Sequence, residues 1–446
     1  MHRALAHQAE AFPELDLAPL ATEELEQRDA AFAHAICDAV LRRWITLEYL
    51  ISVFSSRPFG ELDPRLRGVL LAGAAQMLLL EKVPPHAALN ESVEWAKHAV
   101  KPAAGGLVNA VLRKIAGLVY GDQAGVPERS RRVRWTGAQD QVPLPDGTAV
   151  TLREPVLPED EAARWAVATS HPVGLLRRWA ERWGREQAKD FAAHDLVIPP
   201  TVLNVRFAGV PVKGAEPHER DGHAVFGGSR AELVELLRSR QDVWVQDAAS
   251  GLAVASVAEM RPRVVMDLCA GQGTKTRQLA ATFPGARVVA TDVDTRRLAT
   301  LREIGKSQPR VEVVDPGAIP SWRGRADLVL LDVPCSNTGV LPRRVEARYR
   351  CGAEQLSRLV EIQRGILGDA TSLLAPGGAI LYSTCSIEPE ENREQVRWGE
   401  AQLGLKASNE HRTMPAGLPG EPSRGYHDGA YSAVLRPVSG RTANGS

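Results

Sequence analysis

The sequence predicts a multidomain protein. It has an all-helical N-terminal part, a small α/β module, and a C-terminal α/β part with a doubly wound sheet. Its 446 residues are enough for roughly two to four domains. Apolar residues recur at helical spacing over residues 1–120. Between Val264 and Asn392, apolar runs end in aspartate or cysteine, as expected where the strands of an open sheet end at a ligand site.

Residues 1–120 are expected to form helices throughout. Ala31–Phe54 and Leu66–Leu80 each have an apolar helical face, and Glu91–Ala99 and Leu107–Leu118 follow. Basic and acidic residues roughly balance here, so any contact with a polyanion would need one basic face. The alternative is a module that serves packing alone.

Residues 121–160 are predicted to be a connector and residues 161–250 a small α/β module. The basic cluster Arg129–Trp135 either contacts phosphate or is a solvated loop. Within the module, Ser170 is a start signal for a helix that carries Trp179, which we interpret as core. Thr201–Phe207 alternates as a strand does.

Composition limits the possible classes. The formal net charge is zero, so a nucleic-acid enzyme would need a local basic surface. The five cysteines lie far apart without a C-x-x-C pair, which argues against a disulfide framework or a zinc site. We find no apolar run long enough to span a membrane and no signal-peptide core, and we therefore expect a cytoplasmic protein.

The C-terminal part, residues 251–446, begins with a pattern typical of nucleotide sites. An apolar run ends at Asp267, and a turn with Gly271 and Gly273 leads into a helix at Thr274. A second Val-rich run ends at Asp292, where such folds place a carboxylate that binds ribose. A purely structural turn would look the same.

Two cysteines separate these alternatives. Cys335 follows the apolar run that ends at Asp332, and Cys385 follows another run that ends at Thr384. A lone free cysteine is usually a small core residue. Two thiols at strand ends of one sheet, beside a nucleotide-type turn, instead indicate covalent chemistry.

These motifs resemble a known family. DVPCSNTGV and YSTCSIEPEEN are similar to the paired cysteine motifs of the NOP/Sun RNA cytosine carbon-5 methyltransferases, and DLCAGQGTKT resembles their S-adenosylmethionine loop. PPHAALNESVEWAK and GGLVNAVLRKI resemble a NusB-like domain, which points to the RsmB/Sun type. The resemblance implies a NusB-like RNA-binding domain at 1–120, an RNA-recognition module at 161–250 and a Rossmann-like class I methyltransferase domain at 251–446.

The resemblance also assigns roles. It makes Cys385 the nucleophile and Cys335 the residue that assists product release, with Asp332 supporting the cytosine ring. Chemistry alone leaves the choice of cysteine open, because DNA cytosine methyltransferases attack with a P-C cysteine. The cofactor would be bound by Asp332 and by a set drawn from three further strand ends: Cys269, Ala270, Gly271, Gln272, Gly273, Thr274, Lys275, Asp292 and Asp315. Cys269 is interpreted as packing rather than catalytic.

The chain departs from the family pattern in two places. Gly271, Gln272 and Thr274 replace Ala, Pro and Gly of the usual loop, which puts cofactor affinity in question. Asn337 stands where Gly is usual, and Asn tolerates a left-handed backbone better than most residues. Four arginines after the Cys335 motif are candidates for RNA backbone contact: Arg343, Arg344, Arg348 and Arg350.

We therefore expect S-adenosylmethionine-dependent methylation of carbon 5 of a cytidine in small-subunit (16S) rRNA, through a covalent cysteine–cytosine intermediate and without a metal. The expected partner is RNA, with no membrane, and nothing suggests an obligate oligomer. Two alternatives remain at this point. One is another RNA target such as tRNA, and the other is a non-catalytic RNA-binding ribosome assembly factor.

Overall fold

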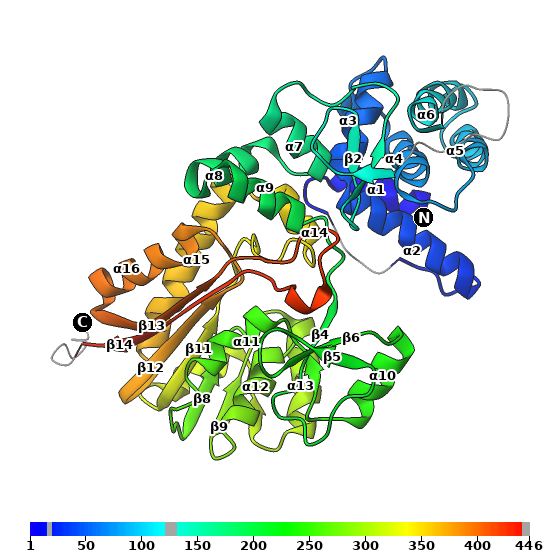
Figure 1. Ribbon diagram of the computed structural model, residues 1–446. Helices are drawn as coiled ribbons and strands as arrows, with labels where there is room; N and C mark the ends of the chain where they lie inside the picture. The colour runs from blue at the N-terminus through cyan, green and yellow to red at the C-terminus, as the bar shows by residue number, and fades with distance from the viewer. Residues whose placement is uncertain (16–19, 121–131, 439–446) are drawn as a thin grey trace. The chain divides into compact units, whose positions relative to one another are not determined.

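The computed structural model describes residues 1–15, 20–120 and 132–438 (Figure 1). Arg129 and Arg131 of the predicted basic cluster lie outside the described residues. The chain forms two compact units. The first comprises Met1–Ile198, Leu341–Cys351 and Leu418–Glu421, and the second comprises Pro199–Val340, Gly352–Gly417 and the chain from Pro422.

The N-terminal part of the first unit is helical, as predicted. Its helices are α1 (His2–Ala11), α2 (Gln27–Arg42), α3 (Trp44–Phe54), α4 (Pro64–Leu79), α5 (Pro85–Ala99) and α6 (Ala104–Tyr120). Helix α4 is buried on nearly every side and packs against the other five. Small residues allow this packing: a Cβ on Gly68 would lie 2.7 Å from the backbone of Ala6.

The segment Ala31–Phe54, predicted as one helical stretch, forms the two helices α2 and α3. The break falls at Arg43, whose φ is −125° and ψ 24°. The guanidinium of Arg43 is buried and donates to the carbonyl oxygens of Pro143 and Ala168. A buried charge needs such partners. The break between α2 and α3 places the guanidinium group where it reaches them.

The first unit also holds a small antiparallel sheet and, within residues 161–194, three further helices. The sheet has the order β1-β3-β2, with β1 at Arg132–Arg134, β2 at Gln141–Pro143 and β3 at Thr148–Thr151. The helices are α7 (Glu161–Thr169), α8 (Val173–Trp183) and α9 (Arg185–His194). Trp179 on α8 is fully buried, so its interpretation as core is confirmed.

The prediction that Ser170 begins a helix is wrong. Ser170 ends α7 with a left-handed backbone (φ 61°, ψ 47°), and Pro172 is the residue before α8. The predicted module 161–250 is also divided between the units, because the boundary falls between Ile198 and Pro199.

The second unit begins with a four-stranded antiparallel sheet of order β5-β6-β4-β7. Its strands are β4 (Thr201–Asn204), β5 (Ala215–Pro217), β6 (His223–Phe226) and β7 (Trp244–Val245). Helix α10 (Arg230–Ser239) follows β6 and starts with a capping box between Ser229 and Glu232.

The large sheet of the second unit has seven strands in the order β10-β9-β8-β11-β12-β14-β13. The first five are parallel, and β14 and β13 pair antiparallel at one edge. Their bounds are β8 (Val264–Asp267), β9 (Arg287–Ala290), β10 (Val311–Val313), β11 (Ala326–Asp332), β12 (Leu374–Thr384), β13 (Leu405–Thr413) and β14 (Ala430–Pro437).

Helices cover both faces of this sheet (Figure 1). One core packs α11 (Ala248–Ala255), α12 (Thr274–Thr282) and α13 (Thr295–Ser307) against one face. The other packs α15 (Ala353–Thr371) and α16 (Arg393–Leu403) against the opposite face. Neighbouring strand residues alternate between the two cores, as Val265 and Met266 do. The predicted doubly wound, Rossmann-like fold is confirmed.

Helix α14 (Val345–Arg350) lies within the stretch Leu341–Cys351, which belongs to the first unit although the residues on both sides of it belong to the second. We call this stretch the α14 segment. In the part of the chain that the structure describes, no helix is long and apolar enough to cross a membrane.

Candidate active site

The two motif cysteines lie side by side in the second unit. Strands β11 and β12 are parallel neighbours, with Asp332 opposite Ser383. Cys335 and Cys385 follow these strand ends, and their sulfur atoms are 3.3 Å apart. Both are free thiols, with Cys335 buried and Cys385 partly exposed. The expectation of two thiols at one sheet edge is therefore met, and we call them the cysteine pair.

The environment distinguishes the two thiols. The hydrogen bond with Cys385, and after it burial, raises the pKa of Cys335 well above its usual value. Cys335 therefore keeps its proton at neutral pH and can donate it toward the sulfur of Cys385. An attacking thiol must reach the thiolate form, so this environment is better suited to a supporting role than to attack.

Asp332 is held by a lysine that comes from the glycine turn. Lys275 Nζ donates to Asp332 Oδ2 at 2.9 Å and to Ser250 Oγ at 3.1 Å. Burial lowers the pKa of Lys275, but the contact with Asp332 outweighs it and the pKa is raised. The lysine is thus a charged partner of the predicted catalytic aspartate. Ser250, on α11, carries no motif signal that the sequence analysis could have used.

The glycine loop, Cys269–Lys275, makes a tight turn between β8 and α12. Gly271 and Gly273 have φ of 57° and 83°, and Gly273 N donates to Ala270 O at 2.8 Å. A side chain on Gly273 would also collide with Leu301 at 2.9 Å. Both left-handed positions of this loop are glycines, so the departures from the family loop leave a strain-free turn.

Asp292 closes the loop from the next strand. Its carboxylate accepts hydrogen bonds from Gly271 N at 2.8 Å and Asp294 N at 2.9 Å, and the residue is 4% exposed. The carboxylate has further lone pairs for a ligand hydroxyl. Asp315 lies two residues past β10, as Asp292 does past β9, and the two strands pair. Asp315 is exposed and accepts from Arg302.

Asp267, at the end of β8, is a fully buried carboxylate beside this loop. Thr276 Oγ1 donates to its Oδ2 at 2.7 Å, whereas Oδ1 has no hydrogen-bond partner among the described residues. Burial raises the pKa of Asp267 to about 7, against the opposing effect of the Thr276 hydrogen bond. Burial, followed by the charge of Asp267, also raises the pKa of Cys269, so Cys269 is a poor nucleophile.

A buried polar network under the cysteine pair was missed by the sequence analysis. The carboxylate of Glu391, from the EPEEN motif, accepts from Ser336 N at 2.8 Å, Ser336 Oγ at 2.5 Å and Gln363 Nε2 at 3.0 Å. Ser336 Oγ is 3.1 Å from Ser386 Oγ. Ser336 and Ser386 each directly follow one of the two cysteines, so Glu391 connects the two cysteine loops. The position of Glu391 in the EPEEN motif could have identified it as a site residue from the sequence.

Asn337 has a left-handed backbone (φ 60°), as the sequence analysis expected of an Asn at this position. Its Oδ1 lies 3.2 Å from Cys385 Sγ, and its Nδ2 donates to the carbonyl of Cys335 at 3.0 Å. This side chain therefore contacts both members of the cysteine pair.

The four candidate RNA-binding arginines lie in the α14 segment of the first unit, and one of them must be corrected. Arg348 is fully buried, and its guanidinium donates to the carbonyl oxygens of Arg42, Thr169 and Asp195 at 3.1, 3.2 and 2.7 Å. Because it is fully buried and both terminal nitrogens donate to backbone carbonyls, Arg348 is not available to phosphate, and the prediction for this residue is wrong.

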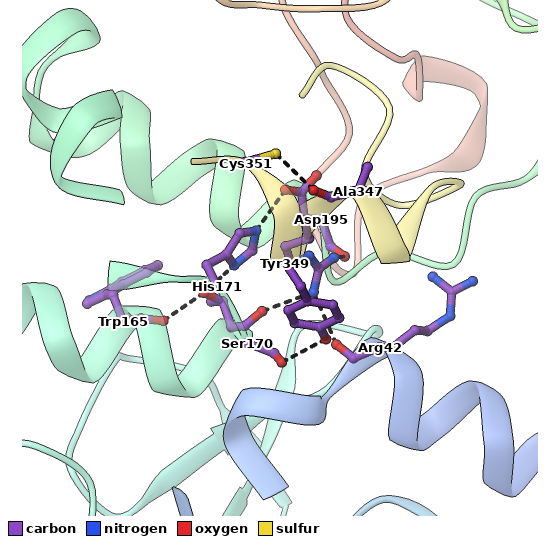
Figure 2. A network of polar contacts seen from close by, with 10 residues as sticks. Arg42, Trp165, Ser170, His171, Asp195, Ala347, Tyr349 and Cys351 are labelled. Atoms are coloured by element: carbon purple, nitrogen blue, oxygen red, sulfur yellow. Dashed lines mark hydrogen bonds and ion pairs between the residues drawn. The ribbon is translucent and has the colours of Figure 1, made fainter. Parts of the chain in front are cut away.

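Figure 2 shows the polar contacts around Ser170, His171, Asp195 and Tyr349. The hydroxyl group of Tyr349 donates to Leu41 O at 2.6 Å and lies 3.1 Å from Ser170 Oγ. His171 Nε2 is 2.9 Å from Asp195 Oδ2. Arg350 is half-buried and pairs with Glu14 at 3.4 Å. Arg343 and Arg344 are exposed, and they remain candidates for RNA contact.

Comparisons with known proteins agree with this architecture. A family model described as 16S rRNA methyltransferase RsmB/F matches residues 256–424, and one described as NusB family matches residues 3–117. Proteins named ribosomal RNA small subunit methyltransferase B from Cronobacter sakazakii and Vibrio cholerae are each 30% identical to this chain over 439 residues. The alignments cover 94% of this chain and 92% of theirs.

Two solved structures have a similar fold. The crystal structure of PH0851 has a TM-score of 0.71 at 20% identity, covering 97% of this chain and 98% of its own. A methyltransferase homolog protein from Pyrococcus horikoshii has a TM-score of 0.51 at 20% identity, covering 63% of this chain and all of its own. At this level of identity the likeness shows the fold alone.

Proposed function

The chain belongs to the RsmB/F family of methyltransferases, and from that membership we propose that it methylates carbon 5 of a cytidine in 16S rRNA with S-adenosylmethionine as the donor. The observation that carries this proposal is the cysteine pair, with its sulfur atoms 3.3 Å apart at the edge of a methyltransferase sheet. We further propose that the chain acts as a monomer.

The reaction needs covalent help because carbon 5 of cytosine is a weak nucleophile. The thiolate of Cys385 adds to carbon 6, and carbon 5 then attacks the methyl group of the sulfonium donor. A base removes the carbon-5 proton, the carbon–sulfur bond breaks, and its electrons return to Cys385. We assign assistance in this release to Cys335, which stands beside the departing sulfur and retains its own proton.

Asp332 and Lys275 are proposed to hold the ring of the cytosine. They form an ion pair at 2.9 Å, and Asp332 lies three residues before Cys335. A carboxylate and an ammonium group together offer an acceptor and a donor, which matches the polar edge of cytosine. This pairing also gives Lys275 a role toward the base as well as toward the cofactor.

The residues of the glycine loop fit S-adenosylmethionine. Asp267 Oδ1 is buried with no partner among the described residues, and a buried carboxylate oxygen favours a cationic donor such as the amino group of the methionine end. We propose that the glycine loop holds that end, that Asp292 accepts from the ribose, and that Asp315 lies near the adenine. When bound, the cofactor supplies the electrophilic methyl group.

The rRNA target is proposed from the relatives, which are named ribosomal RNA small subunit methyltransferase B. They match this chain over nearly their full length. The NusB-like domain and the exposed Arg343 and Arg344 are proposed to bind the RNA backbone. The alternative of a non-catalytic assembly factor rested on the altered cofactor loop. The strain-free turn at Gly271 and Gly273 weakens it.

Covalent trapping tests the proposal. We would incubate wild type, Cys335→Ala, Cys385→Ala and the double variant with 16S rRNA and S-adenosylmethionine, and then look for denaturant-resistant protein–RNA adducts on a gel. Cys335→Ala alone should accumulate an adduct, because attack proceeds while release stalls. Cys37→Ala, which alters a thiol of the N-terminal helices, is the matched control and should behave as wild type.

Each outcome is informative. An adduct that disappears in the double variant would establish Cys385 as the nucleophile, and sequencing the trapped RNA would identify the cytidine. An adduct in Cys385→Ala would exchange the two roles. If no variant traps RNA and wild type transfers no methyl group to rRNA, the proposed activity is wrong. A tRNA adduct in place of an rRNA adduct would change the substrate and keep the chemistry.

A further inference from the structure

Asn337 occupies a backbone position that favours glycine. Its φ is 60°, and Val340 N donates to Asn337 O at 3.0 Å, which closes a turn after Cys335. A glycine would adopt this conformation without a steric penalty. The backbone alone therefore does not require the side chain of Asn337, and its two contacts indicate what the side chain does.

The hydrogen bonds fix which way the amide faces. Nδ2 donates to the carbonyl oxygen of Cys335 at 3.0 Å. The reversed amide would bring two acceptor oxygens to that distance, which is unfavourable. Oδ1 therefore faces Cys385 Sγ at 3.2 Å. Because Oδ1 carries no proton, Cys385 must be the donor of this hydrogen bond.

The hydrogen bond to Asn337 and the contact with Cys335 favour opposite protonation states of Cys385. The bond to Asn337 exists only while Cys385 keeps its proton, since a thiolate would face the lone pairs of Oδ1. Cys335 Sγ, at 3.3 Å, can donate to Cys385 and so favours the thiolate. The same sulfur thus has one neighbour that favours its protonated form and one that favours its reactive form.

We propose that Asn337 is a positioning residue that holds Cys385 as a neutral thiol in the free enzyme and so limits its reactivity before RNA binds. The proposal rests on the proposed function in naming Cys385 as the attacking group. The hydrogen bond itself requires neither RNA nor cofactor. The competing explanation is that Asn337 merely shapes the turn through Nδ2 and has no effect on the sulfur.

Site-resolved alkylation of the free, full-length protein tests the proposal. Iodoacetamide would be added at pH 7.5, and the modification of each cysteine followed by peptide mass spectrometry. Asn337→Gly removes the acceptor and keeps the backbone conformation, so Cys385 should react roughly tenfold faster, as expected for the loss of one hydrogen bond of ordinary net strength. Asn337→Asp keeps an acceptor oxygen and adds a negative charge, so Cys385 should react several-fold more slowly than in wild type.

A matched control separates this effect from a loosened loop. Asn409, in β13, has the same left-handed backbone (φ 48°) and is exposed. Asn409→Gly should leave all alkylation rates unchanged. General loosening of the cysteine loops would speed alkylation of both Cys335 and Cys385 in Asn337→Gly, and would speed it in Asn337→Asp as well.

Acceleration in the Gly variant with slowing in the Asp variant, both confined to Cys385, is the expected result. Equal rates in wild type and Asn337→Gly, or faster reaction in both variants, would overturn the proposal. The measurement uses no RNA, so its failure is distinct from failure of the methylation proposal, which the trapping experiment decides independently.

Discussion

Two buried charged side chains, one in each unit, have similar surroundings and different uses. Arg348 in the first unit and Glu391 in the second are both fully buried, and both have several hydrogen-bond partners. The partners of Arg348 are backbone carbonyls of α2, α7 and the residue after α9. Those of Glu391 include Ser336, the residue directly after Cys335 of the cysteine pair. The partners of a buried charge, and not its burial, therefore indicate whether it serves stability or the reaction.

The largest expected effect is on stability, at Arg348. Arg348→Ala would leave three buried carbonyl oxygens without their donor, at a cost of about 4 kcal/mol in the free energy of unfolding of the first unit. Thermal and urea unfolding would measure it. Arg344→Ala, on an exposed arginine four residues earlier, is the matched control and should change stability by less than about 0.5 kcal/mol. Equal stability in the two variants would contradict a structural role for Arg348.

Glu391 should affect the reaction more than the fold. Glu391→Ala removes the acceptor that connects the two cysteine loops, and we expect methyl transfer to fall about 100-fold because small displacements of reacting groups have effects of this size. Single-turnover methylation would measure it. Glu394→Gln, on the exposed side of α16, is the control. Glu391→Gln keeps part of the network and should lie between the two.

The rate of disulfide formation distinguishes a displaced cysteine pair from simple unfolding of the Glu391→Ala variant. Mild oxidation of wild type should form a Cys335–Cys385 disulfide readily, because the sulfur atoms are already in contact. Glu391→Ala should form it more slowly even where its unfolding transition is unchanged. If activity falls only in proportion to the fraction unfolded, Glu391 has no specific role toward the cysteine pair.

A third buried charge, Asp267, predicts a pH dependence. Its folded-state pKa is about 7, raised by burial, whereas the unfolded value is about 3.9. The stabilisation from its protonated form is therefore fully present below about pH 4 and is lost as pH rises toward and through 7. The free energy of unfolding of the second unit should fall by about 2 kcal/mol from this group between pH 5 and pH 8.

Urea unfolding of Asp267→Asn and wild type at both pH values would measure this contribution. The pH dependence should be smaller in the variant. Asp327→Asn, a carboxylate at the opposite end of the sheet whose Oδ2 accepts from two backbone amides, should keep the dependence of wild type. A variant Asp267→Asn with an unchanged pH dependence would contradict the assignment.

The smallest expected effect is at the surface of the α14 segment. Replacing Arg343 and Arg344 by Gln should weaken RNA binding roughly three- to tenfold and reduce its salt dependence, because two phosphate contacts are lost. Stability should not change. Filter binding at several salt concentrations would measure this. The control is Arg350→Gln, whose guanidinium pairs with Glu14. Equal losses in both variants would mean that exposure does not mark the RNA-binding arginines.

The sequence by itself determined the fold class and the edge of the sheet where the cysteine pair lies. Helical spacing predicted the N-terminal helices, and strand-end residues such as Asp292, Cys335 and Cys385 predicted the reactive edge, because parallel strands must bring their carboxyl ends together. The left-handed backbone at Asn337 was also predictable, since few residues other than Gly and Asn tolerate it. These inferences depend only on local patterns and on the rules of one sheet.

Only the tertiary structure decided what each polar side chain contacts. Arg348 reads as an exposed basic residue in the sequence, yet its partners lie about 150 to 300 residues away along the chain. Ser250, which accepts from Lys275, and Gln363, which donates to Glu391, are closer in the sequence, at 25 and 28 residues, but they too come from other elements. The physical reason is that the burial of a charge depends on hydrogen-bond partners from distant segments, and no local pattern contains that information.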